Sequence, residues 1–95
     1  MERVPVRFLP GVGPATEGDL ERLGIAYLDQ LVGEDGDALY LRLGRLDGRL
    51  ADPCVADVFA SLVAIAAGEP ARPWFSFSEE RKARWWAEGR PTLAD

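Results

Sequence analysis

The residues best suited to bind a ligand stand near the start of the chain, in the segment LPGVGP at positions 9–14. Two glycines around one apolar residue favour a tight backbone turn, and Pro14 has the backbone angle that suits the first position of a helix. The first amides of a helix have no partners within the helix, and the helix dipole adds partial positive charge there. An anion can bind such a turn without a basic side chain. The sequence therefore predicts a phosphate site at Gly11, Val12 and Gly13.

The residues around this turn have the pattern of a helix-hairpin-helix. A helix is predicted over positions 14–23, where Leu20 lies on the face turned back to Val12, and Gly24 ends it with a left-handed cap. The first helix has two turns at most, because the segment before the turn is short and contains a proline. We expect the hairpin unit to span residues 8–25.

The charges beside the turn are mixed. Arg7 and Arg22 are the bases that could assist phosphate binding, whereas Glu17, Asp19 and Glu21 follow the turn on the predicted helix. These carboxylates would repel DNA; their alternative role is to compensate the helix dipole on a solvated face. The whole chain has a formal net charge of −5. A DNA-binding domain usually presents a basic face, so such a face must come mainly from the C-terminal quarter.

The C-terminal quarter mixes bases with aromatic rings. Residues 69–95 contain five bases and five acids, whereas residues 1–68 contain six bases and eleven acids. Aromatic rings can stack on unpaired bases for about 1–3 kcal/mol per base, but a small chain also needs large apolar side chains in its core. Adjacent Trp85 and Trp86 point about 100° apart on a helix, so we expect one to stay exposed. The candidate secondary contacts for nucleic acid or a partner are Trp74, Arg81, Lys82, Arg84, Trp85 and Trp86.

Apolar residues at helical spacing predict the remaining elements. A brief helix is expected over 27–32 and a longer one over 37–47, while the clearest helix runs from Asp52-Pro53 to Gly68. A last helix over 78–88 follows a stiff, proline-containing linker. We therefore expect an all-α fold, a compact bundle of about five helices built on the helix-hairpin-helix. The parts of this single domain (1–95) are the hairpin unit (8–25), a helical body (26–68), the linker (69–73) and an aromatic-basic C-terminal helix (74–91).

Composition argues against most enzymatic chemistry. The chain has no histidine and a single cysteine, Cys54, so it lacks the usual zinc ligands and general bases, and no intramolecular disulfide can form. We expect Cys54 to be a small, partly buried residue at the start of a helix. Asp29, Glu34, Asp35 and Asp37 lack the ligand spacing of a calcium loop and are interpreted as solvated loop acids. No enzyme activity, metal site or cofactor is expected, although hairpin carbonyls could hold a monovalent cation.

Membrane insertion is not expected. No apolar run approaches the ~20 residues that cross a bilayer, and charged residues stand where a signal peptide would be apolar. The sequence predicts a soluble cytoplasmic protein without membrane contact.

Several separated segments are similar to those of one protein family. They are LPGVGP at 9–14 with LGI at 23–25, ALYLRL at 38–43, DPCV at 52–55, PWFSFS at 73–78 and ERKA at 80–83. Over nearly its whole length the chain resembles the small bacterial helix-hairpin-helix proteins called pathogenicity-locus or mitomycin-resistance-like proteins. The resemblance implies an all-helical domain that binds DNA, with a link to DNA repair or damage resistance. Ala15 and Glu17 depart from the DNA-binding form of the hairpin, which often has a base and a small residue at these places.

Together these features predict a non-enzymatic module that contacts the DNA phosphate backbone without sequence specificity, because phosphate contacts position a protein but do not read bases. The alternative is a protein–protein interaction module, in which the hairpin is only structural and exposed aromatic residues dock a partner protein or a second copy. The net charge of −5 favours this alternative. Salt separates the two functions, since DNA binding weakens steeply as salt rises and an aromatic interface persists.

Overall fold

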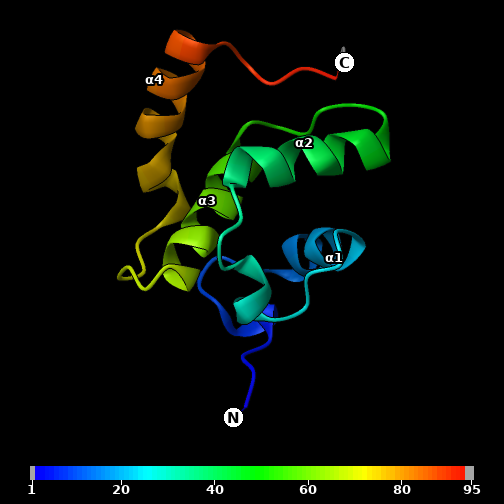
Figure 1. Cartoon of the computed structure of the whole chain (residues 1–95), viewed down its shortest axis with the longest axis vertical. Coiled ribbons are helices and arrows are strands. Elements are labelled where there is room, and N and C mark those ends of the chain that lie inside the picture. The colour runs from blue at the N-terminus through cyan, green and yellow to red at the C-terminus, as the bar shows by residue number, and fades with distance from the viewer. Residues whose placement is uncertain (1, 94–95) are drawn as a thin grey trace.

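The computed structural model describes residues 2–93, and within this range the chain forms four α-helices. They are α1 (Pro14–Arg22), α2 (Gly36–Asp47), α3 (Cys54–Ala66) and α4 (Ser78–Glu88), arranged as Figure 1 shows. The expectation of an all-α fold is confirmed. The expected number of about five helices was too high, because two predicted short helices are single 3-10 turns.

In the described part of the chain, three 3-10 turns lie between and before the helices: η1 (Val6–Phe8), η2 (Leu28–Leu31) and η3 (Trp74–Phe77). η1 replaces the expected first helix of the hairpin. Prolines at both of its ends limit its length, since Pro10 disfavours the helical conformation at Leu9, which is extended. η2 replaces the expected helix over 27–32 and is closed by Gln30, whose Oε1 accepts hydrogen bonds from the amides of Ala26 at 2.7 Å and Tyr27 at 3.0 Å.

Local capping explains where the longer helices begin. The carboxylate of Asp35 accepts hydrogen bonds from the amides of Asp37 at 2.8 Å and Ala38 at 3.1 Å, which fixes the first turn of α2. Asp52 accepts from the amide of Cys54 at 2.9 Å, so α3 begins where the Asp52-Pro53 pair predicts. These two aspartates satisfy backbone donors that a helix leaves without partners.

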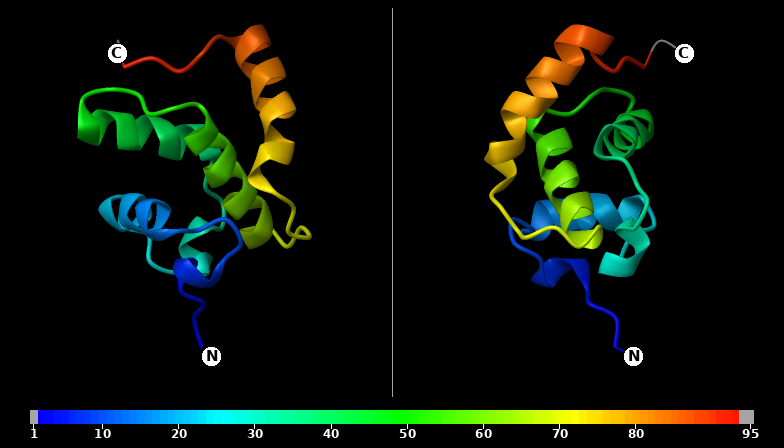
Figure 2. Two further views of the ribbon diagram at one scale, coloured as in Figure 1. Left: turned by 180° about the vertical axis from the view of Figure 1, so that it is seen from behind. Right: turned by 60° about the vertical axis from the view of Figure 1, so that its left-hand side comes forward.

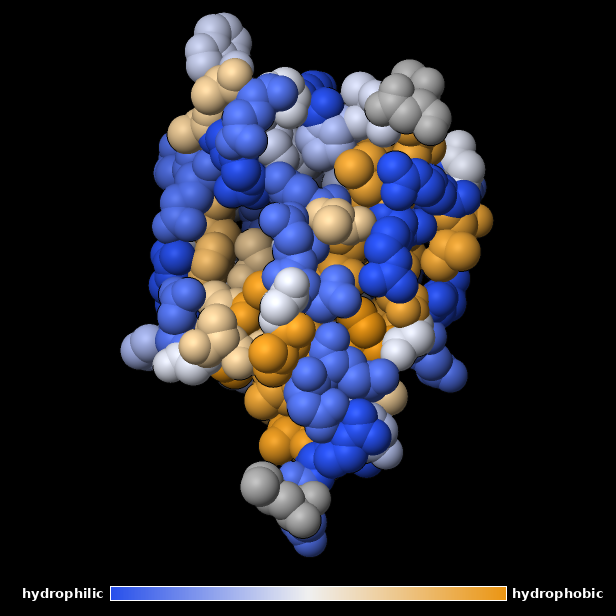
Figure 3. Space-filling model, viewed as in Figure 1, coloured by the Kyte–Doolittle hydropathy of each residue, from blue (hydrophilic) through white to orange (hydrophobic). Residues whose placement is uncertain are grey.

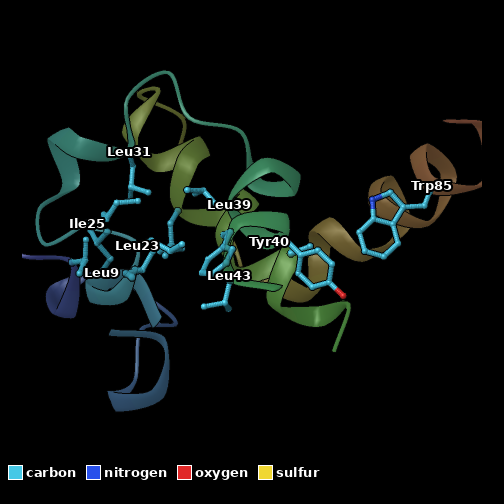
Figure 4. Close-up of a cluster of buried hydrophobic side chains, with 13 residues drawn as sticks. Leu9, Leu23, Ile25, Leu31, Leu39, Tyr40, Leu43 and Trp85 are labelled. Carbon is cyan, nitrogen blue, oxygen red and sulfur yellow. The ribbon is translucent and has the colours of Figure 1, made fainter. Parts of the chain in front are cut away.

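The hydrophobic core surrounds α3, which packs against α2, α4, η2 and η3. Figure 2 shows α3 between α2 and α4 in both views. Leucines from the first half of the chain fill one end of the core, and Trp85 of α4 points towards Tyr40 of α2 at the other end (Figure 4). The Tyr40 hydroxyl donates to the carbonyl of Ala51, so this buried ring also fixes the loop before α3.

Helices α2 and α3 approach each other backbone to backbone at Gly36. A Cβ atom at this position would stand 2.9 Å from the amide nitrogen and 3.0 Å from the Cα of Ala60. Such distances lie inside van der Waals contact, so the absence of a side chain at Gly36 allows the close packing.

Backbone hydrogen bonds join residues 4–6, before and at the start of η1, to residues 26–28, after α1. The amide of Val6 donates to Ala26 O at 3.0 Å, and the amide of Leu28 donates to Val4 O at 2.8 Å. An isolated antiparallel bridge joins Pro5 to Tyr27 between them. This closure holds η1 against the chain after α1 and so positions the turn between η1 and α1. None of the helices among residues 2–93 has the length and apolar character needed to span a membrane.

Candidate functional site

The glycine turn (residues 9–13) joins η1 to α1 and lies at the molecular surface. Gly11 has a φ of +83°, a left-handed conformation that favours glycine, and Gly13 is the N-cap of α1. Both glycines are exposed, while Val12 packs against the core. The Val12 amide donates to Leu9 O at 3.2 Å, so it serves the turn itself. Within residues 2–93 the amides of Gly11 and Gly13 have no hydrogen-bond acceptor, which leaves them open to a ligand.

The predicted bases of the hairpin lie on different sides of the turn. Arg7 is exposed on η1, with its guanidinium carbon 4.8 Å from the centroid of the Phe8 ring, and it lines a cavity of about 270 Å³ together with Glu17 and Glu21. Arg22 stands at the opposite end of α1, where it forms an ion pair with Asp47 and a longer one with Asp19 at 3.6 Å. The structure therefore does not bring Arg22 to the glycine turn.

A cavity of about 380 Å³ lies on the other side of Gly11, between the glycine turn and the linker before η3. Its walls are Pro10, Gly11, Ala71, Arg72, Pro73 and Trp74. The Cδ1 atom of Trp74 stands 3.9 Å from the place that a Cβ of Gly11 would occupy. Trp74 is thus the predicted secondary contact that the fold brings beside the predicted phosphate site. We call this space the Trp74 cavity.

Arg72 closes one side of the Trp74 cavity and is held there by several contacts. Its guanidinium carbon lies 3.7 Å from the centroid of the Phe77 ring, and its Nη2 atom is 3.0 Å from Oε1 of Glu80. Ser76 accepts further hydrogen bonds from Arg72 and donates through Oγ to Pro73 O at 2.7 Å. Sequence reasoning did not select Arg72 as a site residue, since only the fold shows that the linker returns to the glycine turn.

The first buried ion pair joins α4 to α3. Asp57 has no exposed surface, and its carboxylate accepts two hydrogen bonds from Arg81, at 3.0 and 3.1 Å, and one from Ser78 Oγ at 2.8 Å. The side chain of Arg81 is 14% exposed. Arg81 therefore holds α4 against α3, and its charge is not available to nucleic acid.

The second ion pair joins α4 to the start of α2. Asp37 accepts two hydrogen bonds from Arg84, at 2.8 and 3.0 Å, and one from Trp85 Nε1 at 3.0 Å. Burial acts to raise the pKa of Asp37, but the hydrogen bonds from Arg84 and Trp85 outweigh it and place the pKa below its ordinary value. Arg84 and Trp85 are thus also structural. The interpretation of Asp37 as a solvated loop acid was wrong.

The other three acids that the sequence analysis interpreted as loop acids, Asp29, Glu34 and Asp35, also contact groups within the protein. Asp29 accepts hydrogen bonds from both Nε and Nη2 of Arg3 at 2.8 Å, and Glu34 stands 3.9 Å from Arg42. Asp35 caps α2, as described above. Each of these carboxylates therefore has a partner within the protein.

The outer face of α4 carries the remaining predicted contacts. Trp85 is 8% exposed and Trp86 is 92% exposed, which confirms that one of the two adjacent rings stays outside the core. Lys82 is exposed, with Glu79 3.6 Å away, and lines a shallow cavity with Trp86 and Arg90. Figure 3 shows predominantly hydrophilic residues along the edge where α4 lies.

Two arginines of α2, Arg42 and Arg45, were not predicted as site residues, although they lie beside the predicted Arg22. Arg22, Arg42 and Arg45 line a cavity of about 240 Å³ with Leu23 and Leu46. Arg42 donates to Leu23 O at 3.0 Å, which fixes its guanidinium against the end of α1. The spacing of Arg42 and Arg45 on one helix face was the available signal.

Cys54 is half-buried at the first position of α3, as the sequence predicts. Burial and the neighbouring carboxylate of Asp52 raise the pKa of its thiol. Since the thiolate is the reactive form, the thiol is a poor nucleophile at neutral pH.

Lowering the pH is expected to destabilise the fold, because it protonates the carboxylate of Asp37. The folded-state pKa lies below the unfolded value of about 4, so the stabilisation is complete above that value and is lost as the pH falls through the folded pKa. Thermal unfolding between pH 7 and pH 3 measures this loss. The variant Asp37→Asn should have a lower midpoint at pH 7 and a shallower fall with acid. Parallel curves for the two proteins would contradict this role of Asp37.

Comparison with known proteins identifies relatives of the chain. The family model described as "Pathogenicity locus" (Cdd1) matches residues 4–83, which include the glycine turn and Trp74. The chain is 40% identical over 81 residues to the mitomycin resistance protein McrB of Streptomyces lavendulae, and the alignment covers 85% of this chain and 77% of the relative. No solved structure matches the chain. These similarities show that the chain belongs to the pathogenicity-locus family.

Proposed function

We propose that η1, the glycine turn and α1 form a helix-hairpin-helix that binds the phosphate backbone of DNA. The observation that carries this proposal is that Gly11 and Gly13 are both exposed and that their amides have no acceptor within residues 2–93. These amides stand beside the positive end of the α1 dipole, where a phosphate is favoured. The closure of residues 4–6 on 26–28 supports the same proposal, because it holds the turn in place before a ligand arrives.

The bound protein recognises DNA without reading its sequence. The proposed contacts reach phosphate oxygens, which have the same chemistry at every nucleotide. Neither of the two ion pairs that join α4 to α3 and α2 has a free charge to add, and Arg22 is paired at the far end of α1. Binding is therefore of modest affinity. The site lacks a nucleophile paired with a base, so the proposed module is non-enzymatic.

The proposed biological role is resistance to DNA damage. The relative in Streptomyces lavendulae is named a mitomycin resistance protein, and it aligns with most of this chain. A module that binds backbone phosphate regardless of sequence can act wherever damage lies.

Fluorescence anisotropy with labelled single-stranded, duplex and branched DNA tests the proposal. If about two phosphates are neutralised, affinity should fall roughly tenfold between 50 and 200 mM salt. Binding that follows this salt dependence supports the backbone contact. Absence of binding to every DNA form at low salt would overturn the proposal.

A second candidate function is supported by Trp86, whose 92% exposure is unusual for so large an apolar ring. In this function α4 docks a partner protein or a second copy of the chain through Trp86, and the glycine turn is only structural. Such an interface buries apolar surface and persists at high salt, whereas the DNA contact does not. The same salt series therefore distinguishes the two functions.

A further inference from the structure

The residues that line the Trp74 cavity are suited to bind a flat aromatic ring. The indole of Trp74 forms one wall, and the rings of Pro10 and Pro73 form others. Phe75 packs edge-on against Trp74, with ring centroids 5.9 Å apart and planes at 85°, so the indole has a neighbour that limits its movement. A wall that is already fixed loses little freedom when a ligand stacks on it.

The charges around the glycine turn favour a negatively charged ligand on the Trp74 side. Among the described residues no carboxylate lines the Trp74 cavity, and Arg72 does, although the chain has sixteen acids and eleven bases. The cavity beside η1 is lined by two carboxylates, Glu17 and Glu21, against one base, Arg7. A polyanion bound at the turn therefore meets a net negative charge on the η1 side, whereas on the Trp74 side it meets no lining carboxylate and Arg72 in its exposed ion pair with Glu80.

We infer that the Trp74 cavity receives an unpaired nucleobase of the DNA strand whose phosphate binds the glycine turn. This inference rests on the proposed function and adds a preference for single-stranded DNA. Gly11 belongs both to the turn and to the cavity wall, so one nucleotide can place its phosphate on the turn amides and its base against Trp74. The base enters only when it is unpaired, because bases within a duplex are stacked on both faces and must be extruded at a cost.

Two DNA forms and three variants test the inference. One probe is a labelled single strand, and the other is a duplex whose two ends are closed by linkers without bases, so that it presents no unpaired base. Wild-type protein is expected to bind the single strand more tightly. Trp74→Leu should weaken single-strand binding roughly tenfold and leave binding to the closed duplex unchanged. Trp74→Phe, which keeps an aromatic face, should retain most of the preference.

Val32→Ala provides the control, since Val32 is an apolar residue that is 63% exposed and does not line the cavity. It should leave the ratio of the two affinities unchanged. Equal affinity of the wild-type protein for both probes, or equal losses in Trp74→Leu and Val32→Ala, would overturn the cavity assignment while leaving backbone binding intact. Failure of the wild-type protein to bind either probe would overturn the proposed function instead. Circular dichroism of each variant shows that it is folded.

Discussion

Replacing Asp57 with asparagine is expected to lower the free energy of unfolding by about 3–5 kcal/mol, the usual cost of removing one partner from a buried ion pair. Asp57 is fully buried and accepts three hydrogen bonds, so the variant leaves the charge of Arg81 without a counter-ion. Domains of this size have only about 5–15 kcal/mol in total. Urea unfolding followed by circular dichroism measures the change.

Asp29→Asn is the matched control for this experiment. Asp29 is also paired with an arginine, but its side chain is 52% exposed and the pair is screened by solvent, so its removal should cost far less than that of Asp57. Similar losses in the two variants would contradict the structural role of the Asp57 pair. If Asp57→Asn does not fold, a double variant, Asp57→Leu with Arg81→Met, should restore folding because it removes both charges.

Replacing Gly13 with aspartate is expected to weaken DNA binding by roughly 10–100-fold without loss of stability. Gly13 is the N-cap of α1, has an extended conformation at φ −100° and has no atom within 4 Å of the place of a Cβ. An aspartate there accepts hydrogen bonds from the first amides of α1, which should stabilise the helix by a few tenths of a kcal/mol. The same carboxylate lies beside the proposed phosphate position and repels the ligand, so anisotropy should report weaker binding while the thermal midpoint stays or rises.

Gly13→Ala separates the effect of charge from that of the added side chain. Alanine fits the same conformation and space but has no oxygen to occupy the amides, so it should bind DNA within about threefold of the wild type. A Gly13→Asp variant that binds as well as Gly13→Ala would show that the turn amides do not hold the phosphate.

The helices were predictable from the sequence because their ends are encoded locally. The pair Asp52-Pro53 predicts the start of α3, and its cap is a hydrogen bond between residues two positions apart. α1 and α4 likewise occupy the ranges that their apolar spacing and flanking glycines predict. The 3-10 turns were harder to predict, since four residues with helical spacing are compatible with either helix type.

Whether the basic residues of α4 face the solvent or pair within the protein depends on residues that are distant in the sequence. Arg84 and its partner Asp37 are 47 positions apart, so spacing alone cannot show that this base faces the protein. Basic and aromatic residues on one helix fit a nucleic-acid surface or a packed face equally well. Trp74 belongs to the candidate site for an equally non-local reason, because the linker returns to Gly11.

The approach of α2 to α3 restricts how this sequence can change. An added Cβ at position 36 would meet the backbone nitrogen and Cα of Ala60, atoms that every amino acid has. A second substitution at position 60 therefore cannot make room for a side chain at position 36. Variants with any other residue at position 36 can keep this core only by moving α2 away from α3. A substitution at position 36 therefore cannot be compensated by a change of the side chain at position 60.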